Sequence, residues 1–276
     1  MNQFLSSKWL RFIAATMVVV NGFFPACWIL LTSLKTEGEL VSKPITYWPH
    51  NPVLENYVRA FTDQPLLKYL GNSFAVALMS TALSLLVAAG AAYAIARLNL
   101  KRRQLILTCI VASSMFPLVT LLVPIFETMR QLDLLNTYTA LVLPYTVLNL
   151  PVCTLVLVSF FQSSPKDLEN AAMIDGCTRL GALFKIVVPL AAPGVFTAGI
   201  LGFVNAWDEF LLALSLNSSA SMPTLPVGIS LYQGEFTFPW PTISAALIVA
   251  IVPVAVLIAV FQERVVGGLT QGGLKG

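Results

Sequence analysis

The sequence predicts an all-α, polytopic membrane protein with six transmembrane helices. Of its 276 residues, 57% are hydrophobic and 11% are charged, whereas soluble domains carry about 25% charged residues. The hydrophobic residues also gather in blocks of the length, about 20 residues, that a helix needs to cross a bilayer. The six candidate spans are approximately residues 9–34, 69–96, 104–129, 138–161, 193–215 and 241–262.

The first span follows Lys8 and Arg11, an arrangement that a cleaved signal peptide also shows. Its apolar run is longer than the 7 to 15 residues of a signal core, and no clear A-x-A site follows it. We therefore expect an uncleaved signal anchor. In the second span, the small residues from Ala88 to Ala92 favour close packing of helix backbones.

Prolines interrupt the later spans, at positions 117, 124, 144, 151 and 253. Each proline removes a backbone donor, which must be compensated within the bundle or in a cavity. The pattern fits ordinary kinks and a role in gating equally well.

The fifth span contains two acids, Asp208 and Glu209, next to Trp207. Ionisable groups at this depth usually face a cavity or a partner, so both are candidates for the translocation path. Alternatively, the span breaks near Trp207 and the acids lie at the aromatic-rich interface. Asn72 and Asn205 are further path candidates, although span amides more often hydrogen-bond between helices.

The distribution of Lys and Arg orients these spans. With a cytoplasmic N-terminus, inner segments hold 11 of the basic residues and outer segments hold five. The positive-inside rule then places both termini, and the segment 162–192, in the cytoplasm.

Segment 162–192 contains residues that typically begin and end helices. Ser164 can cap a helix, Pro165 suits its first position, and Asp167 completes an S-x-x-D pattern. We expect this helix to run to Gly176, where a left-handed residue would end it. A second helical piece should end before Pro189.

The first of these helices suits a cleft in a soluble partner. Ala171 and Ala172 permit close approach, while Glu169 and Asp175 could fix orientation through charged hydrogen bonds. From the residues alone, a plain surface loop is nearly as plausible.

The run ENAAMIDGC, followed by FKIVVPLAAP, resembles the cytoplasmic E-A-A loop of ABC importer permeases, specifically the carbohydrate-importer type. Ala171, Ala172, Asp175, Gly176 and Pro189 stand at the family's spacing. Asn170 replaces the usual acid before the alanines, and Glu169 matches an upstream acid. Four further stretches from YWPHNPVLENYVRAF to LPVGISLYQGEF, and the closing GLTQGGLKG, resemble the family in the same order.

The resemblance implies a type I ABC importer permease fold in a bacterial cytoplasmic (inner) membrane. Residues 1–67 would form the anchor helix and an outer loop. Residues 68–262 would form the five-helix core with its coupling loop 162–192, and residues 263–276 a cytoplasmic tail. Coupling would use Glu169, Asn170, Ala171, Ala172, Asp175, Gly176 and Pro189, and a loop with Gln233, Gly234 and Glu235 would contact the binding protein.

The implied function is import of a sugar, with di- or oligosaccharides favoured, by ATP-driven alternating access. The partners would be a second homologous permease, two ATPase subunits and an extracytoplasmic solute-binding protein. The chain has no G-x-x-x-x-G-K-[ST] loop, so ATP and Mg would bind the ATPase partners, and this chain would hold no cofactor and would not be an enzyme.

Other functions remain open. The same importer class could carry a polyol or a glycerophosphodiester. A proton-coupled secondary carrier could use Asp208 and Glu209 as its relay. A membrane enzyme or a metal site finds little support, because His50 is the only histidine and no C-x-x-C pair occurs, and no long basic tract suggests nucleic acid.

Overall fold

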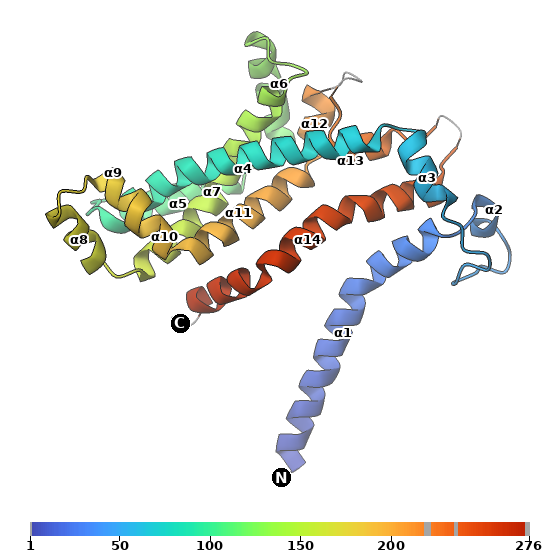
Figure 1. Cartoon of the computed structure of the whole chain (residues 1–276), viewed down its shortest axis with the longest axis horizontal. Coiled ribbons are helices and arrows are strands. Elements are labelled where there is room, and N and C mark those ends of the chain that lie inside the picture. The colour runs from blue at the N-terminus through green and yellow to red at the C-terminus, as the bar shows by residue number, and fades with distance from the viewer. Residues whose placement is uncertain (1, 218–221, 235–236, 274–276) are drawn as a thin grey trace. The chain divides into compact units, whose positions relative to one another are not determined.

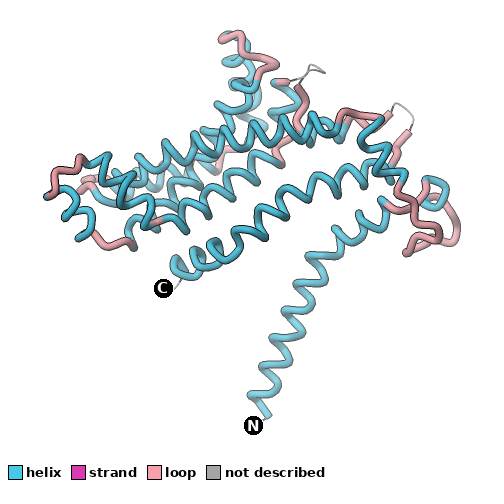
Figure 2. The backbone as a smooth tube through the Cα atoms, in the orientation of Figure 1, coloured by secondary structure: helices cyan, strands magenta, loops and turns pink. Residues whose placement is uncertain are grey.

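A computed structural model describes residues 2–217, 222–234 and 237–273, with side chains from Lys8 to Phe261 outside the two gaps. Within these ranges the regular structure is helical and no strand occurs (Figure 2), which confirms the all-α class. The elements are α1 (Asn2–Ser33), α2 (Glu37–Leu40), α3 (Glu55–Thr62), α4 (Leu66–Arg97), α5 (Arg103–Ser114), α6 (Leu118–Gln131), α7 (Tyr138–Ser163), α8 (Asp167–Ile174), α9 (Arg179–Ala182), the π-helix η1 (Leu183–Val187), α10 (Val188–Leu190), α11 (Ala192–Trp207), α12 (Leu211–Leu216), α13 (Leu225–Ser230) and α14 (Trp240–Gly273).

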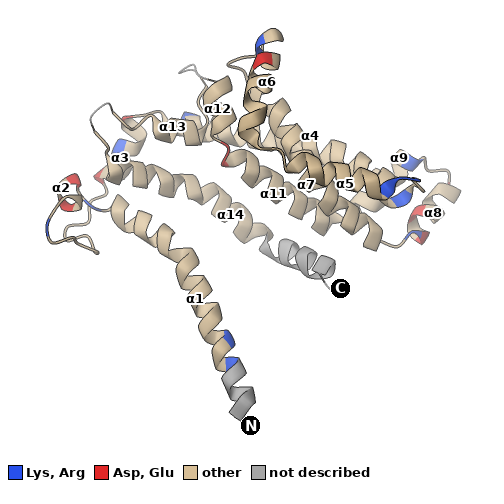
Figure 3. Ribbon diagram, turned by 180° about the vertical axis from the view of Figure 1, so that it is seen from behind, with Lys and Arg blue, Asp and Glu red and all other residues tan. Residues whose placement is uncertain are grey.

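Length and composition identify the membrane spans. Four helical stretches are long and apolar enough to cross a membrane: Lys8–Ser33, Leu66–Arg97, Tyr138–Ser163 and Trp240–Phe261. Two pairs meet the same criterion together but are bent, α5 with α6 by 88° and Arg179–Leu190 with α11 by 84°. Counting each bent pair as one span gives six. Figure 3 shows that the charged residues lie mostly at helix ends and connections, with long uncharged stretches of ribbon between them.

Two predicted spans are not single helices. In the span 104–129, α5 ends at Ser114 and α6 begins after Pro117, whose backbone is extended at ψ 126°. The proline ring also disfavours a helical conformation in the residue before it, which explains the break. The span 193–215 is divided because α11 ends at Trp207 and α12 begins at Leu211, as the alternative reading of that span expected.

The chain forms two compact units, Met1–Leu67 with Gly228–Pro253, and Lys68–Val227 with Val254–Gly276. In the second unit α4, α7 and α11 lie side by side (Figure 1). Ala88, Ala89 and Ala92 are buried in their core, so the expected packing role of these small residues is confirmed. Gly194 allows α11 to approach α7, because a Cβ there would lie 2.3 Å from Phe160 Cγ.

The first unit fixes the end of the anchor helix α1. The Asn56 amide donates to the carbonyls of Ser33 and Lys35, both at 2.8 Å. Lys35 is only 2% exposed; its ammonium lies 5.4 Å from the Trp28 ring centroid and donates to the Thr46 carbonyl. These contacts hold the loop 35–54 against the end of α1 and against α3.

Candidate functional site

The helix α8 begins without the predicted serine cap. Its N-cap is Lys166, which makes no side-chain capping bond, so the expected S-x-x-D cap at Ser164 is wrong. Ser164 instead ends α7, where its backbone N–H and hydroxyl donate to the Phe160 carbonyl at 3.2 and 3.0 Å. The hydroxyl of Ser164 is therefore used at the end of α7 and makes no bond to the first turn of α8.

The end of α8 is the one the sequence predicts. Gly176 has φ +89°, and its N–H donates to the Met173 carbonyl at 3.2 Å. The Cys177 N–H donates to the Ala172 carbonyl at 2.9 Å. This pair of bonds is the Schellman arrangement, in which a left-handed glycine ends the helix.

The second helical piece continues through Pro189, so its predicted end before that residue is wrong. Thr178 caps α9 by accepting from the Gly181 N–H at 3.1 Å. The chain then widens into η1, and Pro189 follows in the single turn α10. In an α-helix a proline ring clashes with the carbonyl four residues earlier, and a π-helical turn displaces that carbonyl.

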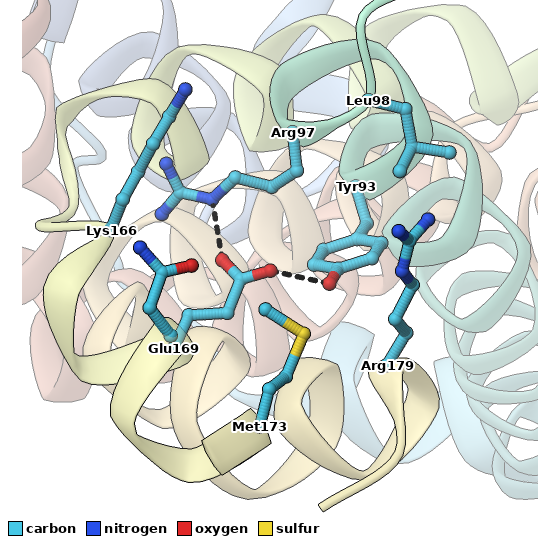
Figure 4. Close-up of a pocket in the computed structure, with 8 residues that line it drawn as sticks. Tyr93, Arg97, Leu98, Lys166, Glu169, Met173 and Arg179 are labelled. Carbon is cyan, nitrogen blue, oxygen red and sulfur yellow. Dashed lines mark hydrogen bonds and ion pairs between the residues drawn. The ribbon is translucent and has the colours of Figure 1, made fainter.

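Glu169 points into the protein. Its carboxylate lies 2.9 Å from Arg97 Nε and accepts from the Tyr93 hydroxyl, both on α4 (Figure 4). The side chains of Arg97 and Glu169 are only 4% and 6% exposed. Arg97 also donates to the Ser164 carbonyl at 3.1 Å. One guanidinium therefore fixes both the end of α7 and the helix α8 to α4, and we call this set of contacts the Arg97 clamp.

The other predicted coupling residues have a different environment. Asn170, Ala171, Asp175 and Gly176 are exposed along α8 and its end, and Ala172 is half-buried. Large apolar side chains are exposed beside them: Leu168 by 51%, Ile174 by 86%, Leu180 by 68% and Phe184 by 47%. Pro189 is exposed but lies apart in sequence, on α10. The segment thus presents an apolar surface that nothing in the described part of the chain covers.

A pocket of about 120 Å³ lies where α8 and α9 meet the end of α4. It is lined by Tyr93, Arg97, Leu98, Lys166, Glu169, Asn170, Met173 and Arg179. In Figure 4, Lys166 and Arg179 stand on either side of the Arg97–Glu169 pair. Three cationic groups and one carboxylate therefore surround it.

The predicted path residues lie toward the other end of α4, a helix of 32 residues and hence about 48 Å long at about 1.5 Å per residue. Asn72 is buried; it donates to the Pro223 carbonyl at 2.9 Å and accepts from the Tyr138 hydroxyl at 2.8 Å. Asn205 donates at 2.8 Å to Asn149, which itself donates to the Gly202 carbonyl. Both asparagines join helices, although Asn205 also has an exposed surface.

The two acids of the fifth span separate into different roles. Glu209 accepts from the N–H groups of Leu212 and Ala213, at 2.8 and 3.1 Å, and from the Tyr145 hydroxyl. It thereby caps α12 and ties it to α7. Asp208, the C-cap of α11, is exposed. Sequence reasoning missed Tyr93, Tyr145 and Asn149, and it used Arg97 only to assign the orientation of the spans in the membrane. The four-residue spacing of Tyr93 and Arg97, which places both on one face at the end of a span, could have indicated a shared polar contact.

The predicted outer contact segment is partly described. Leu231 accepts from the Gln64 side chain at 3.2 Å, and Tyr232 donates to the Ala60 carbonyl of α3. Gln233 is exposed, and the Gly234 N–H donates to the Thr237 carbonyl at 3.0 Å. Glu235 lies outside the described residues. The segment up to Gly234 is thus anchored on α3.

Comparisons with known proteins agree with this architecture. The family model of the binding-protein-dependent transport system inner membrane component matches residues 81–270. The chain is 72% identical over 276 residues to the sulfoquinovosyl glycerol transport system permease protein of Agrobacterium fabrum, covering 100% of this chain and 97% of that relative. It is 36% identical over 270 residues to the trehalose/maltose transport system permease protein of Thermococcus litoralis, covering 97% and 96%.

Among solved structures, the fold is similar to a chain of a bacterial ABC transporter involved in the import of the acidic polysaccharide alginate. The TM-score is 0.79 at 19% sequence identity, covering 94% of this chain and 97% of that chain. At this identity the likeness concerns the fold alone.

Proposed function

The chain belongs to the family of binding-protein-dependent transport system inner membrane components, and from this premise we propose the solute, partners and coupling contacts that follow. It is a permease subunit of an ABC sugar importer, and it forms half of the translocation path. The observation that carries the function is the similarity to importer permeases over essentially the whole chain. Two ATPase subunits hydrolyse ATP and drive alternating access, while this chain acts as the mechanical part.

The solute we propose is sulfoquinovosyl glycerol or a closely related glycerol glycoside. Support comes from the relative that is 72% identical and carries that solute in its name. Relatives named for trehalose and maltose are about half as similar, so a disaccharide is the second candidate. The glycoside combines a sugar with a polyol, and it therefore joins the two substrate classes that the sequence left open.

The coupling contact is proposed for α8. This helix leaves the membrane domain at the Arg97 end of α4, a region rich in basic residues, and the positive-inside rule favours a cytoplasmic position for it and for both termini. Its exposed apolar side chains, above all Ile174 at 86%, suit a cleft on an ATPase subunit. Several large apolar side chains exposed on one short segment are typical of an interaction site.

The proposed path is lined by Asn205 and Asp208, which expose polar groups near the break between α11 and α12. Asn72 and Glu209 support that wall, because their polar atoms are engaged within the protein. A carboxylate held by two backbone N–H groups and a tyrosine is a poor proton relay, which favours the importer over the proton-coupled carrier. Gln233 and Gly234 offer the outer contact to the solute-binding protein.

Reconstitution of the complete transporter tests this function. The chain, its partner permease and ATPase are placed in proteoliposomes, and uptake is measured with binding protein loaded with sulfoquinovosyl glycerol or with trehalose. We expect uptake of the first solute that requires ATP and survives an uncoupler. Uptake that needs a proton gradient and not ATP would establish the carrier instead, and uptake of trehalose alone would change the solute.

A further inference from the structure

We propose that the pocket between α4, α8 and α9 is a cationic socket that receives one carboxylate side chain of the ATPase subunit. The inference rests on the proposed function and assigns the sign of the charge at the contact. From the sequence, Glu169 and Asp175 were expected to fix the orientation of the partner through charged hydrogen bonds. The structure turns Glu169 inward and leaves Lys166 and Arg179 exposed at the pocket.

The charges that line the pocket do not balance. Glu169 is the only acid among its lining residues, and the Arg97 clamp already neutralises it. Lys166 and Arg179 are both exposed, and neither has a hydrogen bond or an ion pair from its side chain to the described part of the chain. The pocket therefore retains two uncompensated positive charges, which an acid would pair.

A second observation points to the same ligand. The Nη1 atom of Arg97 is buried and has no acceptor among the side chains and backbone described. Buried donors without an acceptor are rare, and a water molecule or an anionic group can supply the acceptor.

This edge of α8 lacks the exposed acid that the family resemblance predicts. Asn170 lines the pocket and is neutral, and it stands where the resemblance predicts an acid. The neighbouring Glu169 is 5% exposed and turned toward α4. An acidic contact from this edge of α8 is therefore replaced by basic ones.

The ligand belongs to a protein and not to a membrane lipid. Residues 164–185 contain three basic and three acidic side chains, and Arg97 with Lys101–Arg103 adds four basic ones at the end of α4. This total falls within the range of about four to eight Lys or Arg in segments that bind anionic lipids, so the choice rests on the apolar surface beside the pocket. The exposed Ile174 and Leu180 beside the pocket need a complementary surface. A protein surface provides both the apolar cover and a single placed carboxylate.

Carbodiimide crosslinking tests the socket directly, because this zero-length reagent joins an amine to a carboxylate in contact. The purified complex of this chain with its ATPase is treated and digested, and crosslinked peptides are identified by mass spectrometry. We expect an amide between Lys166 and an Asp or Glu of the ATPase. Lys185, exposed on η1 and outside the pocket lining, is the matched control and should form none.

Neutral variants give an independent readout. In Arg179→Gln, affinity for the ATPase at low salt should fall by up to about fivefold, the range of an exposed ion pair, and the difference should shrink as salt is raised. Lys185→Gln should match the unmodified chain. If the ATPase stays bound but Lys166 forms no crosslink, the socket is wrong and the proposed function still stands. A bound anionic lipid that Arg179→Gln releases would also overturn it. If no ATPase co-purifies even with the unmodified chain, the proposed function fails too.

Discussion

The Arg97 clamp predicts that Glu169→Gln loosens α8 without unfolding the membrane core. The carboxylate is buried and is shared between Arg97 Nε at 2.9 Å and the Tyr93 hydroxyl. Glutamine has nearly the same shape and still offers an oxygen to Tyr93. What it removes is the negative charge opposite a guanidinium that is 4% exposed.

The magnitude follows from leaving that guanidinium unpaired. Removing one partner of a buried ion pair costs about 3–5 kcal/mol. Because the Tyr93 bond and the bond from Arg97 to the Ser164 carbonyl survive, we expect the lower end, about 3 kcal/mol. This free energy corresponds to a roughly 100-fold increase in the equilibrium for local opening of α8.

Hydrogen exchange of the chain in lipid nanodiscs measures that opening. Amides of residues 168–176 should exchange roughly 100-fold faster in Glu169→Gln, while those of α7 and α11 keep their rates. Asp175→Asn is the matched control, because it makes the same chemical change at an exposed position of the same segment. Exchange in Glu169→Gln within about threefold of the unmodified chain, under 1 kcal/mol, would refute the clamp.

Three further predictions concern other parts of the chain. Gly176→Leu places a side chain at φ +89°, costing about 1–2 kcal/mol; it should uncouple ATP hydrolysis from uptake with normal membrane insertion, and full uptake would remove the coupling role. Gly194→Ala puts a Cβ 2.3 Å from Phe160 Cγ and should destabilise the chain by about 1–3 kcal/mol, so an unchanged thermal unfolding temperature would contradict the close packing. The His50 backbone N–H, helped by its ring, lowers the pKa of Glu39 below its ordinary value of 4.5. Folding of the outer loop is therefore favoured above pH 4.5 and loses that contribution as the pH falls through the lowered pKa; proteolysis of loop 41–51 should rise there, and Glu39→Gln should abolish the pH dependence.

Hydropathy predicted the spans but not their bends. Four of the six predicted spans correspond to continuous helices that are apolar and long enough to cross a membrane. The 88° bend before Leu118 was missed because Phe116 and Pro117 contribute to an apolar run whether the helix is straight or broken. Pro144 and Pro151, which look equally disruptive, lie inside continuous α7. A proline marks a lost donor, and tertiary packing decides whether the helix ends there.

Local chemistry predicted the end of α8 but not its beginning. The end of α8 at Gly176 is decided by local backbone conformation, because only a glycine adopts φ +89° at little cost. The role of Ser164 is decided by a distant contact, since its carbonyl accepts from Arg97, 67 positions earlier in the chain. The inward orientation of Glu169 has the same origin. The residues next to Glu169 in sequence do not indicate that the buried guanidinium of Arg97 on α4 will pair with it.

The attachment of α8 to the membrane core bears on its proposed coupling role. The segment is attached at two places: the Arg97 clamp holds α8 to α4, and Leu183 and Val187 are buried in the core that α4 shares with α7 and α11. Between these attachments lies the turn at Gly176. A loop held at one place could swing freely when its partner moves. A loop held at both would carry α4 with it, so the proposed coupling depends on this internal attachment as well as on the proposed contact with the ATPase.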